Sequence, residues 1–314
     1  MPIYDTIIIG GACAGLAAGT YASRRAMKTL IISKDVGGQI ATTPSVENYP
    51  GIDFITGPDL GFAMQAQALK WGAEFISDEV TEIRKRDEKD FLVRTYGGDY
   101  SAKSLILAYG KTPRSLDVPG ERQYGGRGVS YCVTCDAPLY KKKNVVVVGG
   151  GSSAMEGALI LSKIATKVYL VHRRLEFRGE AVLLEQIKTT DNIELVTGSV
   201  SKEIVGDGTY ATGLVVTNTA EGTDRTLSVD GIFVEIGFIV NIKLVQDIVT
   251  LDRLNQVVTN GMQETSTQGI FAAGDLTDTA YKQAVISASE GAKAALSAYA
   301  YVNGAPAGVD WGSH

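Results

Sequence analysis

The sequence contains one local plan twice: a short apolar strand, a run of glycines, a helix and a second apolar strand. A strand that enters a helix through a glycine turn and is followed by a second strand is typical of a βαβ unit. The predicted strand, helix and strand are Tyr4–Gly10, Gly15–Arg25 and Thr29–Ile32 in the first copy, and Asn144–Gly149, Ser153–Lys163 and Lys167–Val171 in the second. The repeat predicts an α/β fold with two Rossmann-like three-layer dinucleotide-binding domains.

Each copy is followed by a predicted meander of strands, Val80–Leu107 after the first and Ile204–Ile236 after the second. The later segment Val245–Val302 does not begin a third copy. Its short strand at Ile270 and its amphipathic helix Gln283–Val302 are typical of the end of the first domain. We therefore expect the second domain to be inserted in the first.

At 314 residues the chain is too long for one comfortable core, which favours two domains. The predicted outer domain is discontinuous and comprises residues 1–115 and 245–314, whereas the predicted inner domain comprises residues 116–244. The connections are expected at about Thr112–Pro119 and Phe238–Leu244, where prolines suit a turn-rich link.

The first glycine run, Gly10-Gly11-Ala12-Cys13-Ala14-Gly15, follows a strand and opens a helix. Backbone N–H groups at such a helix start can hold a pyrophosphate. Ala12 replaces the middle glycine of the GxGxxG pattern, so its methyl group narrows the approach of the phosphate. Ser33 lies where an acid commonly binds the ribose and can form a weaker hydrogen bond to it. The run predicts a dinucleotide site, and the alternative is a glycine turn that packs helix on strand without a ligand.

The second glycine run fits the pattern GxGxxA and comprises Gly149, Gly150, Gly151, Ser152, Ser153 and Ala154. After the next strand come His172, Arg173 and Arg174, with Arg178 one turn further on. An NAD-specific site has an acid at the position of Arg173, and an arginine pair there instead favours the additional phosphate of NADP. The pattern predicts NADPH, against the alternative of a solvated basic stretch at a strand end.

Cys132 and Cys135 form a CxxC motif that is followed directly by Asp136. Two thiols two residues apart can close and reopen a disulphide, and the carboxyl beside them can move the proton that this exchange requires. Neither of the two histidines is close in sequence to the cysteines, so Asp136 is the local candidate for acid/base catalysis. A structural zinc site is an alternative, but Cys13 and the two histidines are poorly spaced to supply the other ligands, so no metal is predicted.

The charge balance argues against nucleic acid or an anionic membrane as a partner, because 35 acidic residues outnumber 30 basic ones. No apolar run approaches the ~18–20 residues of a membrane helix, and no secretory signal is visible. Three cysteines are too few for a disulphide scaffold, and a CxxC in a reducing compartment is catalytic or metal-binding. We expect a cytoplasmic protein.

Several motifs along almost the whole chain agree in order and spacing with one family. The matching stretches are Gly37–Gln39, Val46–Gly51, Thr56–Asp59, Arg127–Asp136, Gly149–Ala154, His172–Arg174, Gly269–Asp275 and Tyr281–Gln283. In them the chain resembles the low-molecular-weight thioredoxin reductases, FAD-dependent pyridine nucleotide-disulphide oxidoreductases of class II. The resemblance implies a homodimer with FAD in the outer domain and NADPH in the inner one. It also implies that electrons pass from NADPH through FAD and the Cys132/Cys135 dithiol to the disulphide of thioredoxin or a thioredoxin-like protein.

The same resemblance assigns roles by position. Cys135 would face the flavin, Cys132 would attack the partner's disulphide and Asp136 would move the proton. The inner domain would rotate on its two links to expose the dithiol. The FAD contacts expected in this way, together with the first glycine run, are Gly10, Gly11, Ala12, Cys13, Ala14, Gly15, Ser33, Gly38, Gln39, Asn48, Val80, Gly110, Gly274, Asp275, Lys282, Gln283 and Ala284. The expected NADPH contacts are Gly149, Gly151, Ser152, Ser153, Ala154, Glu156, His172, Arg173, Arg174 and Arg178.

Some positions depart from the family pattern, and they are Ala12, Cys13, Tyr109, Ala137 and Gly157. Ala12 and Ser33 bear on the affinity for FAD. Cys13 is interpreted as a small buried residue, with a third redox thiol as the alternative. Tyr109 brings a phenol ring toward the flavin–domain junction, where it must find space or fill a gap.

Two other hypotheses remain. One keeps the flavin and the dithiol but takes electrons from ferredoxin, or passes them to another disulphide such as that of a peroxiredoxin partner. The other is a flavin-binding regulatory module without turnover. Relatives that have lost NADPH usually lack the inner glycines and arginines, and both are present here, so NADPH is the favoured donor.

Overall fold

The computed structural model describes residues 3–43 and 45–304, and these fall into two compact units. Unit 1 comprises the chain up to Thr112 and from Val240 onward, and unit 2 comprises Pro113–Ile239. The expected domain divisions, at residues 115/116 and 244/245, lie a few residues beyond these bounds. The predicted outer domain extends to His314, but residues 305–314 lie outside the described part. The assignment of one nucleotide to each unit stays a prediction.

Unit 1 is built on a seven-stranded mixed sheet. Strand β6 organises it, because one edge of β6 pairs with β1 along its length while the other edge pairs first with β5 and then with β17. β17 thus joins the sheet of the first repeat although it lies far along the chain. The strands are β1 Ile3–Ile9, β2 Thr29–Ser33, β3 Glu74–Ser77, β4 Val80–Asp87, β5 Asp90–Thr95, β6 Asp99–Leu107 and β17 Ile270–Ala272.

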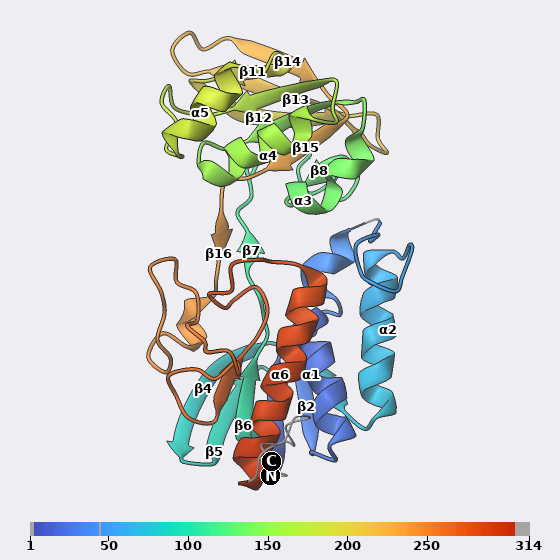
Figure 1. The fold of residues 1–314 in the computed structure, drawn as a ribbon, viewed down its shortest axis with the longest axis vertical. Helices are drawn as coiled ribbons and strands as arrows, with labels where there is room; N and C mark the ends of the chain where they lie inside the picture. Colours follow the sequence, from blue (N-terminus) through green and yellow to red (C-terminus); the bar gives the residue numbers. More distant parts are fainter. Residues whose placement is uncertain (1–2, 44, 305–314) are drawn as a thin grey trace, which may run out of the picture. The chain divides into compact units, whose positions relative to one another are not determined.

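Three long helices of unit 1 cover one face of the parallel part of this sheet (Figure 1). Alternation along β1 explains the two faces: Ile8 packs with the helices, whereas Ile7 and Ile9 pack on the opposite face with β4, β5 and the segment around Val249. The result is the predicted three-layer arrangement. The helices are α1 Cys13–Arg24, α2 Gly57–Lys70 and α6 Ala284–Asn303, with short 3₁₀ turns η1 Gly38–Thr42 and η3 Ile242–Leu244.

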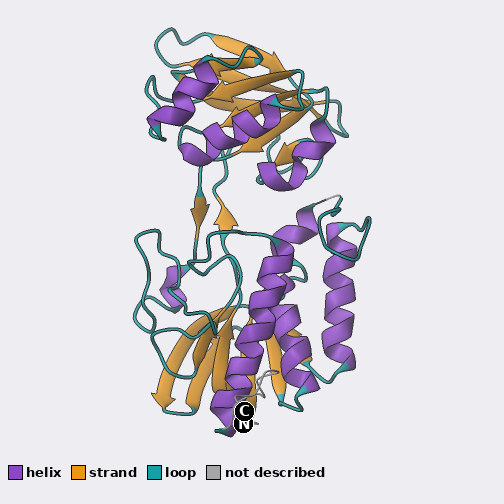
Figure 2. Cartoon of the chain, viewed as in Figure 1, coloured by secondary structure: helices purple, strands orange, loops and turns teal. Residues whose placement is uncertain are grey.

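Unit 2 repeats the plan around a five-stranded parallel sheet of order β11-β10-β9-β15-β8. Val145 and Val147 face the helices, and Val146 and Val148 face a separate antiparallel sheet, β12-β13-β14 (Figure 2). The strands are β8 Val129–Ser130, β9 Asn144–Val148, β10 Lys167–Val171, β11 Ile193–Val196, β12 Ser199–Gly206, β13 Ala211–Asn218, β14 Asp224–Ser228 and β15 Gly231–Val234. The helices are α3 Val133–Asp136, η2 Ala137–Tyr140, α4 Ser152–Ser162 and α5 Ala181–Lys188.

Two differences from the predicted elements have physical causes. Helix α1 begins at Cys13 rather than Gly15, because Ala12 is extended (φ −100°) and serves as the N-cap. The second meander is interrupted between β14 and β15, so that β15 pairs in the parallel sheet and not with β14. In unit 1 the single long strand β6 pairs both with the antiparallel strand β5 and with the parallel strands β1 and β17.

The two links between the units pair with each other. Strand β7 Thr112–Pro113 and strand β16 Phe238–Ile239 form a two-stranded sheet. Pairing continues beyond the strands, because the Arg114 N–H donates to the carbonyl of Gly237 at 2.9 Å. Within the part of the chain that the structure describes, no helix is long and apolar enough to cross a membrane.

Candidate functional site

The CxxC motif lies at the start of α3 in unit 2, where Cys132 and Cys135 are joined as a disulphide with their Cα atoms 5.3 Å apart. Cys132 is the extended N-cap residue, Cys135 lies within the helical turn, and both are half-buried. Sulphurs that are bonded to each other cannot both serve as thiolate ligands, which argues against the zinc alternative. Among residues 3–43 and 45–304 no group of three metal-ligating side chains is found, and His314 lies outside them.

Ser130 links the Asp136 carboxyl to the backbone of Cys132. The Ser130 hydroxyl donates to Asp136 Oδ2 at 2.6 Å and accepts the Cys132 N–H at 3.1 Å. Burial raises the pKa of Asp136, and the hydrogen bond from Ser130 opposes that rise. Asp136 Oδ1 is buried and has no hydrogen-bond partner in the described chain. The carboxyl, one residue after Cys135, therefore has an oxygen that can take up a proton, and its part in the dithiol exchange stays a prediction.

Ser130 was not identified from the sequence. It lies two residues before the motif, on β8, and nothing in its spacing marks it. Its role arises because β8 ends directly at the sulphurs.

Helix α3 rests on α4 through a glycine. A Cβ atom added at Gly157 would lie 2.9 Å from Val133 Cγ2, closer than real Cβ contacts. The Val133 N–H also donates to Glu235 Oε1 at 3.4 Å. Gly157 is one of the departures from the family pattern. Because it has no side chain, Val133 of the dithiol segment can pack closely against α4.

The second glycine run is closed toward the protein and open outward. A Cβ at Gly149 would lie 2.3 Å from the Glu235 carbonyl oxygen and one at Gly150 2.2 Å from the His172 ring, whereas a Cβ at Gly151 meets no atom within 4 Å. Gly151 is also the N-cap of α4 and makes no side-chain capping bond. An uncapped helix start with unobstructed backbone fits a pyrophosphate. Beyond it, Ser152 and Ser153 open the helix, Ala154 is buried and Glu156 is exposed.

Three arginines that are predicted to contact NADPH lie near this loop. The Arg178 N–H donates to the Gly150 carbonyl at 2.8 Å. Arg173, Arg174 and Arg178 are exposed, and none forms an ion pair with any acid that the structure describes. Arginines free of acids are available to a phosphate.

His172 lies beneath the loop and not on its open side. Its ring is 9% exposed, stacks on Phe177 with centroids 5.2 Å apart, and its Nε2 has no partner within the described residues. Burial lowers the pKa of His172, and the charges of the neighbouring arginines lower it further, against a hydrogen bond with the Glu176 backbone. Its predicted contact with NADPH stays a prediction.

The first glycine run in unit 1 is equally constrained. A Cβ at Gly10 would lie 2.3 Å from the Ala108 oxygen, one at Gly11 2.8 Å from the Asp35 oxygen and one at Gly15 1.9 Å from the Gly10 oxygen. Helix α1 has no side-chain cap either. The Ala12 methyl faces Gly38, at 3.1 Å from a Cβ placed there. The loop therefore fits a dinucleotide, and the methyl group of Ala12 finds its space beside a glycine.

Gly15→Ala is expected to destabilise unit 1 by about 3 kcal/mol or more, because the added methyl meets a backbone oxygen that cannot move independently. The expected readouts are a lower midpoint of chemical unfolding and loss of bound flavin. Gly261→Ala is the matched control, since a Cβ there meets no atom within 4 Å. Equal stability of the two variants would show that the loop adjusts freely.

Other predicted FAD contacts are brought together from distant segments. The Asn48 amide donates to Gln283 Oε1 at 3.2 Å, and the Lys282 ammonium donates to the Thr277 carbonyl at 2.6 Å. Burial lowers the pKa of Lys282. The remaining members are placed as follows: Gln39 donates to the Lys111 carbonyl, Asp275 accepts from Ser287, Ser33 ends β2, Val80 begins β4, Ala14 packs under Gly274, Gly110 adopts a left-handed backbone (φ +64°) and Ala284 begins α6.

In unit 1 Cys13 is buried and Tyr109 is partly buried. Burial raises the pKa of the Cys13 thiol to about 11, so it is protonated at neutral pH, as expected of a small buried residue. Tyr109 packs against the core around Val80 and Leu107, and its hydroxyl has no partner in the described chain. Burial raises the pKa of the Tyr109 phenol above the ordinary range.

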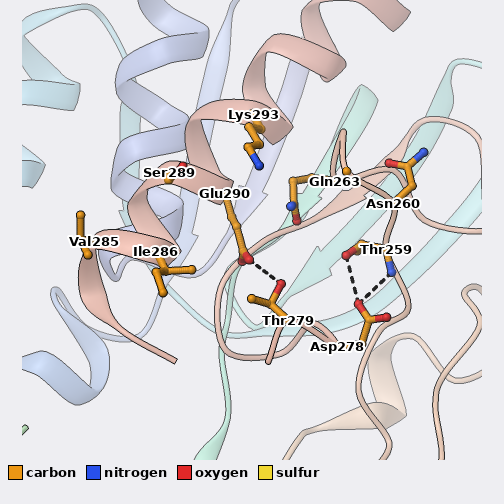
Figure 3. Close-up of a pocket in the computed structure, with 11 residues that line it drawn as sticks. Thr259, Asn260, Gln263, Asp278, Thr279, Val285, Ile286, Ser289, Glu290 and Lys293 are labelled. Atoms are coloured by element: carbon orange, nitrogen blue, oxygen red, sulfur yellow. Dashed lines mark hydrogen bonds between the residues drawn. The ribbon is translucent and has the colours of Figure 1, made fainter. Parts of the chain in front are cut away.

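Glu290 of α6 is a buried acid that was not singled out from the sequence. It is 5% exposed, accepts the Gly274 N–H at 2.7 Å and accepts the Thr279 hydroxyl (Figure 3). It lines a cavity of about 620 Å³ with Gln263 and Lys293, and no predicted site residue lines that cavity. In the sequence, the available signal for Glu290 is that a single acid lies among the small residues of the predicted helix Gln283–Val302.

The described architecture is that of one known family. A family model described as pyridine nucleotide-disulphide oxidoreductase matches residues 4–291. The chain belongs to this family.

Its relatives are thioredoxin reductases. Those of Listeria monocytogenes and Bacillus subtilis are 38% and 37% identical, over 96% of this chain and 94% and 95% of their own lengths. A bifunctional thioredoxin reductase/thioredoxin of Mycobacterium leprae is 41% identical, and the chain spans 65% of its length. The solved thioredoxin reductase of Streptococcus pyogenes has a TM-score of 0.92 and 35% identity, with 96% of this chain and 99% of that chain covered.

These likenesses confirm the resemblance, the two-domain α/β fold and the predicted class of oxidoreductase. FAD and NADPH, the predicted cofactors, are those of the thioredoxin reductase family. The individual residues that contact each cofactor stay predictions.

Proposed function

We propose that this protein uses NADPH to reduce the disulphide of thioredoxin or a thioredoxin-like protein, and that it acts as a cytoplasmic homodimer. One observation carries the proposal: unit 2 holds a disulphide, a partly buried acid next to it in sequence and a dinucleotide loop with arginines free of acids. When bound, NADPH and FAD supply the electron pair that reduces the disulphide. The excess of acidic residues supports a protein partner in preference to nucleic acid or membrane.

The reduced dithiol carries out the exchange. The Cys132 thiolate attacks one sulphur of the acceptor disulphide, whose S–S bond breaks, and the other acceptor sulphur leaves as a thiolate. The Cys135 thiolate then attacks Cys132, which releases the second acceptor sulphur and re-forms the internal disulphide. The acceptor gains two electrons and two protons. Asp136 holds and delivers a proton at the leaving sulphur, and Ser130 fixes its orientation.

Anaerobic titration tests the proposal. NADPH is expected to bleach the flavin absorbance, and oxidised thioredoxin is expected to restore it. Bleaching by reduced ferredoxin but not by NADPH would establish the alternative donor. Bleaching without reoxidation by thioredoxin would refute the acceptor. Sedimentation at enzyme concentrations tests the homodimer.

Asp136→Asn is expected to lower disulphide reduction by about 10²-fold or more, because the acid/base group is lost. The same change is expected to raise Tm at pH 7. The pKa of Asp136 is raised in the folded protein, so the ionised carboxyl costs stability once pH exceeds its ordinary value of 3.8. Below that pH both folded and unfolded chains hold the proton and the two proteins should melt alike. A lower Tm for the variant at pH 7 would contradict the raised pKa of the Asp136 carboxyl.

A further inference from the structure

Glu121 is a buried acid of unit 2 that neither the nucleotide loop nor the dithiol contains. It is 2% exposed. Its Oε2 accepts the Asp117 N–H at 2.8 Å, and its Oε1 accepts the Leu116 N–H at 2.9 Å. A buried carboxylate is costly unless donors surround it, and two of its donors are backbone groups at the unit 2 end of the first link, which the sequence predicts at about Thr112–Pro119. The acid therefore fixes the conformation of that link.

The third donor to Glu121 belongs to the dithiol segment. The Tyr131 hydroxyl donates to Glu121 Oε1 at 2.9 Å, and Tyr131 directly precedes Cys132. Burial and the carboxylate raise the pKa of Tyr131, so the phenol remains a donor at working pH. From Cys132 the contacts continue through Ser130 to Asp136. A continuous set of contacts thus leads from the link to the outer thiol and its acid.

The link end of this path is strained and has room to change. Asp117 has φ +57°, a left-handed conformation that favours glycine, and the Glu121 carboxylate holds its N–H. The segment from Asp117 to Gln123 lines a cavity of about 330 Å³. When the Glu121 carboxylate no longer holds the Asp117 N–H, the strained backbone beside this cavity can take up a second conformation.

We propose that Glu121 and Tyr131 are positioning residues that couple the conformation of the first link to the reactivity of Cys132. The coupling rests on the proposed function, because it gives the dithiol a way to respond when the link bends. Loosening either end of the path then alters the exposure of the outer thiol and the burial of Asp136.

The test measures alkylation of Cys132 by iodoacetamide, by peptide mass spectrometry, after the full chain has been reduced with dithiothreitol. This readout needs neither NADPH nor thioredoxin, so it stands apart from failure of the proposed function. Tyr131→Phe removes only the hydroxyl and is expected to speed alkylation by about threefold or more, the scale of one lost hydrogen bond. Asp117→Gly removes the strain of this left-handed residue, 15 residues from Cys132, and so favours the observed conformation; alkylation is expected to stay at or below the wild-type rate.

Hydrogen exchange gives the reciprocal measurement. Tyr131→Phe is expected to raise exchange at the Leu116 and Asp117 amides. The same variant is expected to shift the pH profile of dithiol exchange downward, because water reaches Asp136; Tyr140 is the other titratable side chain whose charge acts on that acid. These are effects that a purely local loss of packing would not produce.

Two controls keep the result specific. Tyr124→Phe removes the hydroxyl of a buried tyrosine of the same unit, a hydroxyl that forms no described hydrogen bond, and Asn255→Gly relaxes an equally left-handed residue (φ +62°) in unit 1. Neither should change Cys132 alkylation. The coupling is overturned if Tyr131→Phe alkylates at the wild-type rate, if Asp117→Gly speeds alkylation, or if the controls change the rate as much as Tyr131→Phe does.

Discussion

Replacing Cys132 or Cys135 with serine is expected to lower disulphide reduction by on the order of 10³-fold or more, while NADPH still bleaches the flavin. The two sulphurs form one redox unit, since each electron pair taken up breaks the bond between them and is held as the dithiol. A serine oxygen can neither form that bond nor match a thiolate as a nucleophile. The measurement is NADPH-dependent reduction of thioredoxin beside anaerobic bleaching of the same sample.

The two serine variants are expected to differ in what they trap. Cys135→Ser retains the attacking thiol but loses the resolving one, so a mixed disulphide with the acceptor should accumulate at Cys132. Cys132→Ser retains only the inner thiol and should trap far less. Non-reducing electrophoresis followed by peptide mass spectrometry distinguishes them. Equal trapping by both variants would contradict the assignment of Cys132 as the attacking thiol and Cys135 as the resolving thiol.

The double variant Arg173→Ala/Arg174→Ala is expected to raise KM for NADPH by about 10- to 100-fold while changing KM for NADH by much less. Charge-assisted hydrogen bonds contribute about 1.5–3 kcal/mol each, and neither guanidinium is already committed to an acid in the described residues. The two nucleotides differ only in the phosphate that these arginines are predicted to bind, so the ratio of the two KM values isolates that contact.

Arg225→Ala provides the matched control. Arg225 is a half-exposed arginine of the same unit, but it already pairs with Glu194 at 2.8 Å. Its loss should leave both KM values unchanged. If KM for NADH rises as much as KM for NADPH in the double variant, the arginines support the loop in general and do not bind the additional phosphate of NADPH specifically.

The sequence predicts the repeated framework well because its signals are local. Apolar strands alternate between the two faces of their sheets, as Val145 and Val146 do, and each glycine run lies where backbone atoms approach within contact distance. The adjacent residues Cys132, Cys135 and Asp136 form the predicted cluster for the same reason.

The supporting acids could not be predicted because their partners are backbone groups or distant segments. Glu121 acquires its role from the N–H groups of Leu116 and Asp117, and Glu290 from that of Gly274. A backbone N–H carries no residue-specific signal. The N-cap at Ala12 and the break between β14 and β15 likewise depend on dihedral angles and on tertiary pairing.

The ribbon formed by β7 and β16 has a consequence for how this architecture can be cut and rejoined. Its two strands place the entry at Thr112–Pro113 beside the exit at Phe238–Ile239, at the ~4.8 Å spacing of hydrogen-bonded neighbours. A gap of that size can be closed by a two-residue hairpin. The inserted unit is thus a cassette with adjacent ends: it can be excised, exchanged for another or grafted elsewhere without lengthening the chain that surrounds it.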